Sequence, residues 1–367
     1  MADSDLADWL RFATVPGVGP RRQLALLRAF GEPARALAAG EAALREHLPD
    51  GLLAAWVCAA AAPSPQVEAT LAWLATPATA VVTLGDAAYP ARLLDLPDPP
   101  VLLYLKGRTA LLQGTMLGVV GSRGATPQGI DNAKAFSAAL SGAGLGIVSG
   151  LAAGIDAAAH LGGLDGEGRT VAIVGTGLDR VYPASNRALA HRIAEDGLLI
   201  SEFPLGAPPK AEHFPRRNRL IAALSHGVLV VEAALGSGSL ITARQAVELG
   251  REVFAIPGSI HSPQSRGCHR LIKDGAKLVE SADDVLGELD WQTRLLPPRR
   301  VSESLVLPFE AGTDDAVLSA LGHDPADLDA LVVRSGLTVE RLCAILLGLE
   351  LTGRVATLPG GRYQRLA

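Results

Sequence analysis

From residue 116 onward, short apolar stretches alternate with longer amphipathic ones, and this alternation restricts the possible folds more than any other feature. The apolar stretches are short and bounded by glycine-rich turns, which is typical of buried strands. Strands that alternate with helices form βαβ units, so the pattern predicts an α/β fold with a parallel sheet covered on both faces. Strands are expected at residues 116–121, 145–149, 170–174, 198–201, 227–232 and 252–255, and helices at 128–140, 155–164, 186–195, 217–224 and 240–249.

Four of the predicted strands end in loops rich in glycine and serine, at residues 121–127, 149–160, 175–183 and 236–243. Parallel sheets bind ligands at the carboxyl ends of their strands, and the amides at helix N-termini favour anions. Four such loops at one sheet edge therefore predict an anion site. The loop residues expected at this site are Gly121, Ser122, Arg123, Ser149, Gly150, Gly154, Gly175, Ser237, Gly238, Ser239 and Thr242.

The loops lack residues that two common phosphate ligands require. A dinucleotide site needs an acidic side chain about 20 residues after the first glycine loop to bind the ribose hydroxyls, whereas the second strand ends in Ser149 and Gly150. A nucleotide-hydrolysing loop ends in Gly-Lys-Ser/Thr, whereas the first loop carries Arg123. A polynucleotide backbone, bound with little sugar discrimination, is the anion that remains.

The formal net charge is −5, so the chain has no domain-wide basic footprint, and nucleic acid must be bound by a local patch. Residues 208–227 provide one, because cations there surround a phenylalanine. Single-stranded nucleic acid needs aromatic rings for stacking and cations along its backbone. The alternative is a solvated helix start with the ring in the core. The patch consists of Lys210, Phe214, Arg216, Arg217, Asn218 and Arg219.

No residue pattern typical of an enzyme or a metal centre is present. The chain has no H-E-x-x-H or C-x-x-C metal spacing and no G-x-S-x-G nucleophile turn. Asp156, Glu202 and Glu232 would be the first candidates for catalysis, but no nucleophile or metal accompanies them. Asp156 is better explained as a helix cap, and Cys268 with His269 as structural residues. We therefore predict a binding protein without catalytic activity, cofactor or metal ion.

Cysteine usage and hydropathy point to a cytoplasmic protein. The three cysteines are far apart and odd in number, which favours a reducing compartment. No apolar run reaches the roughly 18 residues of a membrane-spanning helix, and the N-terminus lacks a signal pattern. We expect no membrane contact.

Two smaller domains are expected to flank the core, which spans residues 81–290. Residues 1–80 read as short helices, and residues 15–31 resemble a helix-hairpin-helix whose turn amides contact phosphate or serve a structural role. Residues 291–312 read as a linker. Residues 313–367 contain three helical patterns (314–321, 325–335 and 339–349) and a hairpin (353–366), which suggests a winged helix.

Seven sequence blocks between residues 84 and 285 resemble the DprA/Smf family of DNA-processing proteins. They are YPARLLDLPDPPVLLYLKG, GVVGSRGATPQG, IVSGLAAGIDAAAH, SEFPLG, HFPRRNRLIAALSHGVLVVEA, GSGSLITARQAVELGREVFAIPG and LIKDGAKLV. The resemblance implies an extended Rossmann-like core, a helix-hairpin-helix or SAM-like N-terminal domain and a C-terminal winged helix. It also implies a homodimer that binds and protects single-stranded DNA and loads RecA on it during transformation or repair, displacing or bypassing single-strand-binding protein.

The resemblance also implies roles for particular residues. Ser122, Arg123, Phe214 and the run 216–219 would contact the strand, while Gly150, Ser237 and Ser239 would line a phosphate pocket. Some relatives have a lysine where Ala211 stands, and Lys210 would substitute for it. The dimer surface is expected near residues 271–279.

Two other functions compete with this interpretation. One is a nucleotide-cleaving enzyme of the phosphoribohydrolase type, although the loop at 236–239 lacks that group's Pro-Gly-Gly-x-Gly-Thr pattern. The other is a duplex-binding regulator that uses the winged helix. Its two later helices carry only Arg334 and Arg341 as cations, which is few for a helix that reads the major groove.

Overall fold

The computed structural model describes residues 3–61, 64–289, 313–322, 326–338, 342, 345–346, 349–350, 354–358 and 362–365. The chain divides into two compact units, Met1–Arg294 and Leu295–Ala367. The N-terminal helices therefore belong to the same unit as the sheet. The predicted linker at 291–312 lies outside the described residues. Among the described residues, no helix has the length and hydropathy needed to cross a membrane.

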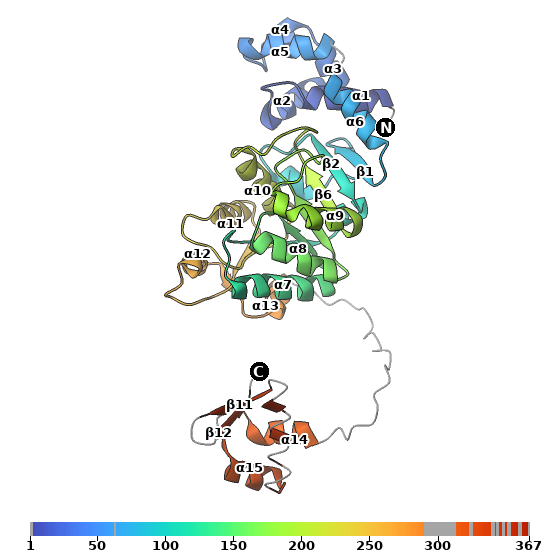
Figure 1. Ribbon diagram of the computed structural model, residues 1–367. Coiled ribbons are helices and arrows are strands. Elements are labelled where there is room, and N and C mark those ends of the chain that lie inside the picture. The colour runs from blue at the N-terminus through green and yellow to red at the C-terminus, as the bar shows by residue number, and fades with distance from the viewer. Residues whose placement is uncertain are drawn as a thin grey trace. The chain divides into compact units, whose positions relative to one another are not determined.

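A nine-stranded sheet forms the centre of the first unit (Figure 1). Its strand order is β1-β2-β6-β5-β4-β3-β7-β8-β9. The strands from β3 to β9 pair in parallel, which confirms the predicted parallel sheet. β2 pairs antiparallel with both β1 and β6, which the βαβ pattern did not predict. The strands are β1 (Thr79–Thr83), β2 (Leu102–Gly107), β3 (Met116–Val120), β4 (Gly146–Ser149), β5 (Thr170–Ile173), β6 (Leu198–Ser201), β7 (Gly227–Val230), β8 (Glu252–Ala255) and β9 (Lys277–Leu278).

Two layers of helices cover the sheet, as expected for strands that are apolar on both faces. Strand β3 illustrates the alternation, since Leu117 and Val119 pack into one core cluster while Met116 and Val120 pack into another. One layer contains α7 (Pro127–Gly142), α8 (Ile155–Asp165), α9 (Arg187–Asp196) and α13 (Ala282–Glu288); the other contains α10 (His213–Leu224), α11 (Gly238–Glu248) and α12 (Arg266–Lys273). The 3-10 helices are η1 (Ala91–Asp95), η2 (Thr109–Gln113), η3 (Ala184–Asn186) and η4 (Pro263–Ser265).

Helix α10 begins earlier than the sequence pattern suggested, at His213 rather than at residue 217. Pro215 lies in its first turn, where a missing backbone N–H costs nothing because the first amides of a helix have no intrahelical partner. Phe214, Arg216 and Arg217 therefore all lie on one helix.

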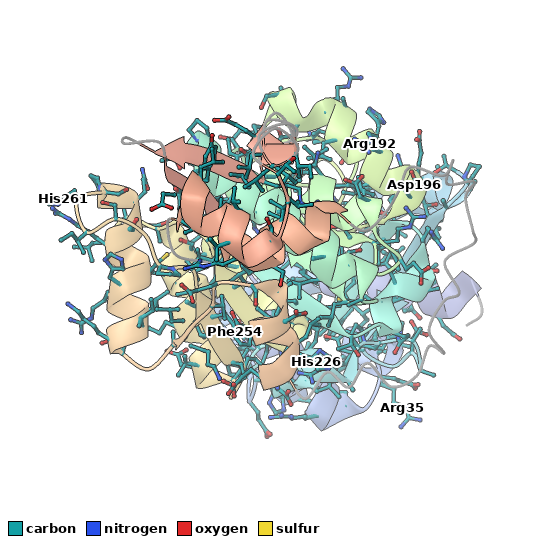
Figure 2. The ribbon with its side chains drawn as sticks, turned by 90° about the horizontal axis from the view of Figure 1, so that it is seen from below. Arg35, Arg192, Asp196, His226, Phe254 and His261 are labelled. Atoms are coloured by element: carbon teal, nitrogen blue, oxygen red, sulfur yellow. The ribbon has the colours of Figure 1, made fainter. Side chains whose placement is uncertain are left out.

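In Figure 2, Phe254 lies deep in the unit, whereas Arg192 and Asp196 project from the outside of α9.

The N-terminal helices gather at one end of the first unit and share a core with the sheet (Figure 1). Phe12 and Trp56 meet edge to face at 5.6 Å in this core, and Trp73 lies 6.3 Å from Tyr104 of β2. The predicted hairpin is present, with Gly17 at φ +78° in the turn between α1 and α2. The helices are α1 (Asp3–Ala13), α2 (Pro20–Phe30), α3 (Pro33–Ala38), α4 (Glu41–Leu44), α5 (Asp50–Ala61) and α6 (Pro65–Leu74).

The second unit is a winged helix. It contains α14 (Thr313–Leu321), β10 (Ala326–Asp327), α15 (Leu328–Ser335), β11 (Val355–Leu358) and β12 (Arg362–Arg365), with strand order β10-β12-β11. The helix predicted at 325–335 starts three residues later, because Ala326–Asp327 pair with β12 and the Asp327 carboxylate then accepts from the Ala330 amide at 2.7 Å.

The remaining C-terminal predictions are tested only where the structure describes the chain. Of the helix predicted at 339–349, Leu342, Leu346 and Leu349 are helical and buried. The hairpin is confirmed by the pairing of β11 with β12, and its tip at 359–361 lies outside the described residues.

Candidate nucleic-acid interface

Two adjoining cavities lie where the strand-end loops meet the start of α10. The larger, about 480 Å³, is lined by the first loop, the β7–α11 loop and α10. The smaller, about 190 Å³, is lined by the β4–α8 loop and by Tyr182, and the two cavities share Arg123, Phe214 and Arg217. Twelve residues named from the sequence therefore line or back these cavities: Gly121, Ser122, Arg123, Gly150, Gly175, Phe214, Arg217, Asn218, Ser237, Gly238, Ser239 and Thr242.

Arg217 forms the floor shared by both cavities, and its side chain is only 4% exposed. Nη1 lies 3.8 Å from the Asp156 carboxylate, which is too far for a hydrogen bond. Neither Nε nor Nη1 has a hydrogen-bond partner in the described part of the chain. Burial lowers the pKa of Arg217, as does Arg123, while Asp156 raises it. Unpaired donors on a buried cation are costly, so this floor is suited to an anion.

Gly150 makes room for this guanidinium. A Cβ atom at Gly150 would lie 1.1 Å from Nη1 of Arg217, so no side chain is compatible with the arginine in this position. The amide of Gly150 donates to the Asp156 carboxylate at 3.1 Å, and the amide of Ala152 donates to the same oxygen at 3.3 Å. Asp156 thus caps the β4–α8 loop, and these two amides point at the protein rather than at a ligand.

His160 fixes the next residue of this loop. Leu151, at φ +58°, donates its amide to Nε2 of His160 at 3.2 Å. Nε2 must therefore be an acceptor, so Nδ1 carries the proton and donates to the Thr170 hydroxyl at 2.7 Å. Burial lowers the pKa of His160 to about 3, which keeps the ring neutral. The loop conformation is thus set by two side chains of α8.

Ser149 and Gly154, both named from the sequence, shape the loops without lining either cavity. The Ser149 hydroxyl is fully buried and donates to the Val119 carbonyl at 2.6 Å. Gly154 has φ +76°, and a Cβ there would lie 2.4 Å from the Ser122 carbonyl oxygen. This glycine therefore allows the first two loops to touch.

An aromatic pair contributes to the lining of the cavities. The rings of Phe214 and Tyr182 are 5.6 Å apart, and the Arg123 guanidinium lies 5.4 Å from the centre of the Phe214 ring. Gly175 backs the phenylalanine, since a Cβ there would lie 3.4 Å from its ring. Tyr182 is 46% exposed and was not named from the sequence. The sequence could have identified Tyr182, because it is an aromatic residue next to the end of the third glycine-rich loop, at residues 175–183.

The β7–α11 loop contributes hydroxyl groups. Ser237 caps α11 by accepting from the Ser239 amide at 3.3 Å, and the two hydroxyl oxygens are 2.7 Å apart. Thr242 follows one turn later and is 1% exposed. In the first loop, the Ser122 hydroxyl accepts from the Gly124 amide at 3.2 Å.

Three cations of the predicted patch lie outside both cavities. Lys210 is exposed and 4.0 Å from Glu212. Arg216 pairs with Glu202 at 3.2 Å and lies over the Phe203 ring at 5.1 Å. Arg219 is enclosed by Glu202 at 2.5 Å and Asp98 at 3.3 Å, with its side chain 8% exposed. The DNA contact predicted for Arg219 stays a prediction, and in the structure its guanidinium is engaged by Glu202 and Asp98 inside the protein.

The three carboxylates considered for catalysis all have structural partners. Asp156 binds loop amides, as described above, and Glu202 binds Arg216 and Arg219. Glu232 accepts from the backbone amide of Thr126 at 2.9 Å and from its hydroxyl at 2.5 Å, which orders the start of α7. Among the described residues, no group of three or more potential ligands is placed to hold a metal ion.

Comparison with known proteins gives the site a context. Residues 80–290 match the family model described as DNA recombination-mediator protein A, and residues 302–361 match the DprA winged helix domain. The chain belongs to this DprA family. It is 41% identical over 312 residues to Protein Smf of Escherichia coli K12, covering 83% of this chain and 82% of that protein. It is 50% identical over 206 residues to DprA of Streptococcus pneumoniae, covering 56% of this chain and 73% of the relative.

Solved structures of the DprA family share the fold. The X-ray structure of DprA from Streptococcus pneumoniae superposes with a TM-score of 0.61 at 37% identity and covers 78% of this chain and 98% of that one. The structure of DNA processing protein A from Helicobacter pylori superposes with a TM-score of 0.52 at 30% identity and covers 57% of this chain and 96% of that one. That structure concerns the single-stranded DNA binding mode of the Helicobacter pylori protein. These matches confirm the resemblance drawn from the sequence blocks.

Proposed function

We propose that this DprA family member binds single-stranded DNA in the two adjoining cavities, does not alter it chemically, and loads RecA onto the bound strand. The observation that carries the binding proposal is the buried Arg217 guanidinium, which belongs to the lining of both cavities and whose Nε and Nη1 have no hydrogen-bond partner in the described part of the chain. A phosphate oxygen would provide the missing acceptor. Charge-assisted hydrogen bonds of this kind are roughly twice as strong as neutral ones.

The surroundings of Arg217 support a strand rather than a free anion. The Ser237–Ser239 turn, which begins α11, also lines the larger cavity, and its hydroxyls and helix amides favour a phosphate. Phe214 and Tyr182 offer adjoining aromatic faces, and a stacked base contributes roughly 1–3 kcal/mol. Only an unpaired base is free to stack on such rings, because a base in a duplex is already stacked and paired.

RecA loading and self-association rest on other grounds. Family membership supports a mediator role in recombination, and protection of the incoming strand would follow from its enclosure in the cavities. We propose a homodimer formed near residues 271–279, because β9 lies at one edge of the sheet and Leu278 there is 44% exposed. Exposed edge strands are templates for pairing with another chain.

Binding is tested by fluorescence anisotropy with a labelled oligothymidine and its duplex with oligoadenine, at several salt concentrations. We expect a clear preference for the single strand and an affinity that decreases linearly on a log–log plot against salt, because each phosphate contact releases counterions. Equal affinity for the duplex would refute the proposal and favour a winged-helix duplex binder. Release of free base from nucleotides would favour the enzyme alternative.

RecA loading is tested separately with a strand coated by single-strand-binding protein. The expected result is that the protein shortens the delay before RecA hydrolyses ATP on this coated strand. An unchanged delay, with binding intact, would remove the loading role but leave the binding role.

A further inference from the structure

A third cavity, of about 340 Å³, lies between the N-terminal hairpin and the core. The turn that joins α1 to α2 lines one side, including Gly17 and Gly19, and Glu202, Phe203 and Arg216 line the other. Its volume is within the range of roughly 300–1,000 Å³ typical of small-ligand sites. The sequence singled out this hairpin turn as a possible phosphate contact, and the cavities described above do not involve it.

The core side of this cavity is lined by Glu202, whose carboxylate has one unpartnered oxygen among the described residues. The Oε2 atom of Glu202 accepts from Arg216 and Arg219, whereas Oε1 is buried and has no hydrogen-bond partner in the described part of the chain. The Glu202 side chain is 3% exposed. A buried acceptor without a donor is costly, so the cavity is suited to a ligand that brings an N–H group.

The hairpin side presents unpartnered donors. The backbone amides of Gly17 and Gly19 donate to no acceptor among the described residues. Gly19 caps α2, whose first turn also carries the exposed side chains of Arg21 and Arg22. The unpartnered amide at this helix N-cap, together with that of Gly17 in the preceding turn, favours a phosphate group.

The two sides together match one nucleotide, since a nucleotide has a phosphate at one end and a base with N–H donors at the other. We propose that this cavity is a second nucleotide subsite for the same DNA strand, formed jointly by the hairpin turn and the core. The base would donate to Glu202 Oε1, and the phosphate would accept from the turn amides. This inference rests on the proposed function, because the strand must first occupy the main cavities.

The start of α10 connects the sites. Phe214 and Arg217 face the main cavities, while Arg216, on the same helix, lines the third. A strand that leaves Phe214 and crosses the first turn of α10 therefore arrives at the hairpin. Arg216, with a side chain 45% exposed, lies where the phosphates would cross.

An abasic scan tests the proposal. Single abasic sites are placed in turn along an oligothymidine of about 20 nucleotides, and the affinity of the full-length protein is measured for each strand. We expect two separated windows of sensitivity, one for the main cavities and one for the third cavity, each weakening binding about tenfold, in line with the stacking and hydrogen-bond energies of a single base.

The Gly19→Glu variant tests whether the second window of sensitivity belongs to the third cavity. Gly19 has an extended conformation, and an added Cβ meets no atom of the described residues within 4 Å, so the variant is expected to fold. Its carboxylate would repel the phosphate at the turn and abolish the second window alone. The matched control is Gly40→Glu, which adds the same charge at another exposed, extended cap without close neighbours. Glu202 is left intact because it also binds Arg219 inside the protein.

The outcomes separate this inference from the proposed function. One window in the wild type, or two windows that persist in Gly19→Glu, would overturn the second subsite while leaving single-strand binding in place. No measurable binding to any strand would instead overturn the proposed function. Loss of the second window in Gly19→Glu, with Gly40→Glu identical to the wild type, would support the subsite.

Discussion

Replacement of Arg217 by methionine is the sharpest test of the site, because it removes the charge while keeping much of the side-chain volume. If the guanidinium binds a phosphate, its loss should cost about 1.5–3 kcal/mol of binding free energy, the range for hydrogen bonds to charged groups. This corresponds to roughly ten- to hundredfold weaker affinity. The salt dependence should also become shallower, because one fewer phosphate is neutralised. Fluorescence anisotropy with oligothymidine measures both quantities.

The stability of the same variant provides an internal check. Removing one member of a buried ion pair costs roughly 3–5 kcal/mol, but the variant also removes two buried donors that have no partner among the described residues, each of which costs about 1–3 kcal/mol. The two contributions oppose each other, so the free energy of unfolding should fall by no more than a few kcal/mol. Urea unfolding measures this change.

Arg192→Met is the matched control, because Arg192 is an exposed cation on α9 that lines neither cavity. It should leave the affinity within about twofold of the wild type, as expected for a distant, screened charge. Wild-type affinity in Arg217→Met would show that the buried guanidinium has only a structural role and does not bind a phosphate.

Three other changes have defined outcomes. Burial lowers the pKa of His160 to about 3, so below about pH 6.5 the unfolded chain binds a proton that the folded chain does not. The free energy of unfolding, measured with urea at each pH, should therefore fall as the pH drops from 7 toward 4, and it should fall less steeply for His160→Gln. Equal pH slopes for the two proteins would contradict this. Tyr182→Ala should weaken oligothymidine binding about tenfold by anisotropy through loss of stacking, and an unchanged affinity would exclude its ring from the site. Leu278→Glu should convert a dimer to a monomer in light scattering by placing a charge on the edge strand, and a dimeric variant would move the interface elsewhere.

The sheet was predictable where its strands are buried on both faces. Strands β3 to β8 read as continuous apolar runs because every such run is covered by helices on either side. β1 was missed because three of its five residues are only half-buried, which leaves a weak pattern, and β9 was missed because it has only two residues, both exposed. The antiparallel direction of β2 was not predictable, because strand direction is decided by tertiary pairing and not by local periodicity.

The chemistry of the site was predictable in kind but not in detail. Strand-end loops and the Phe214 segment identified the right region, because loop glycines and clustered cations are visible in the chain itself. Burial of Arg217 was not predictable, since an arginine in a basic run is expected to be solvated. Nor was the enclosure of Arg219 by Glu202 and Asp98, because those partners come from segments far away in the sequence.

The shared core of the N-terminal helices and the sheet has a practical consequence. Because Tyr104 and Leu102 of β2 are buried in the same cluster as Trp56 and Leu10, the boundary near residue 80 is not a place where the protein can be cut cleanly. A chain shortened to begin at β1 would expose this apolar surface beside an edge strand, a combination that favours aggregation. Studies that compare domains should therefore keep residues 3–289 together and alter the hairpin by point substitution instead.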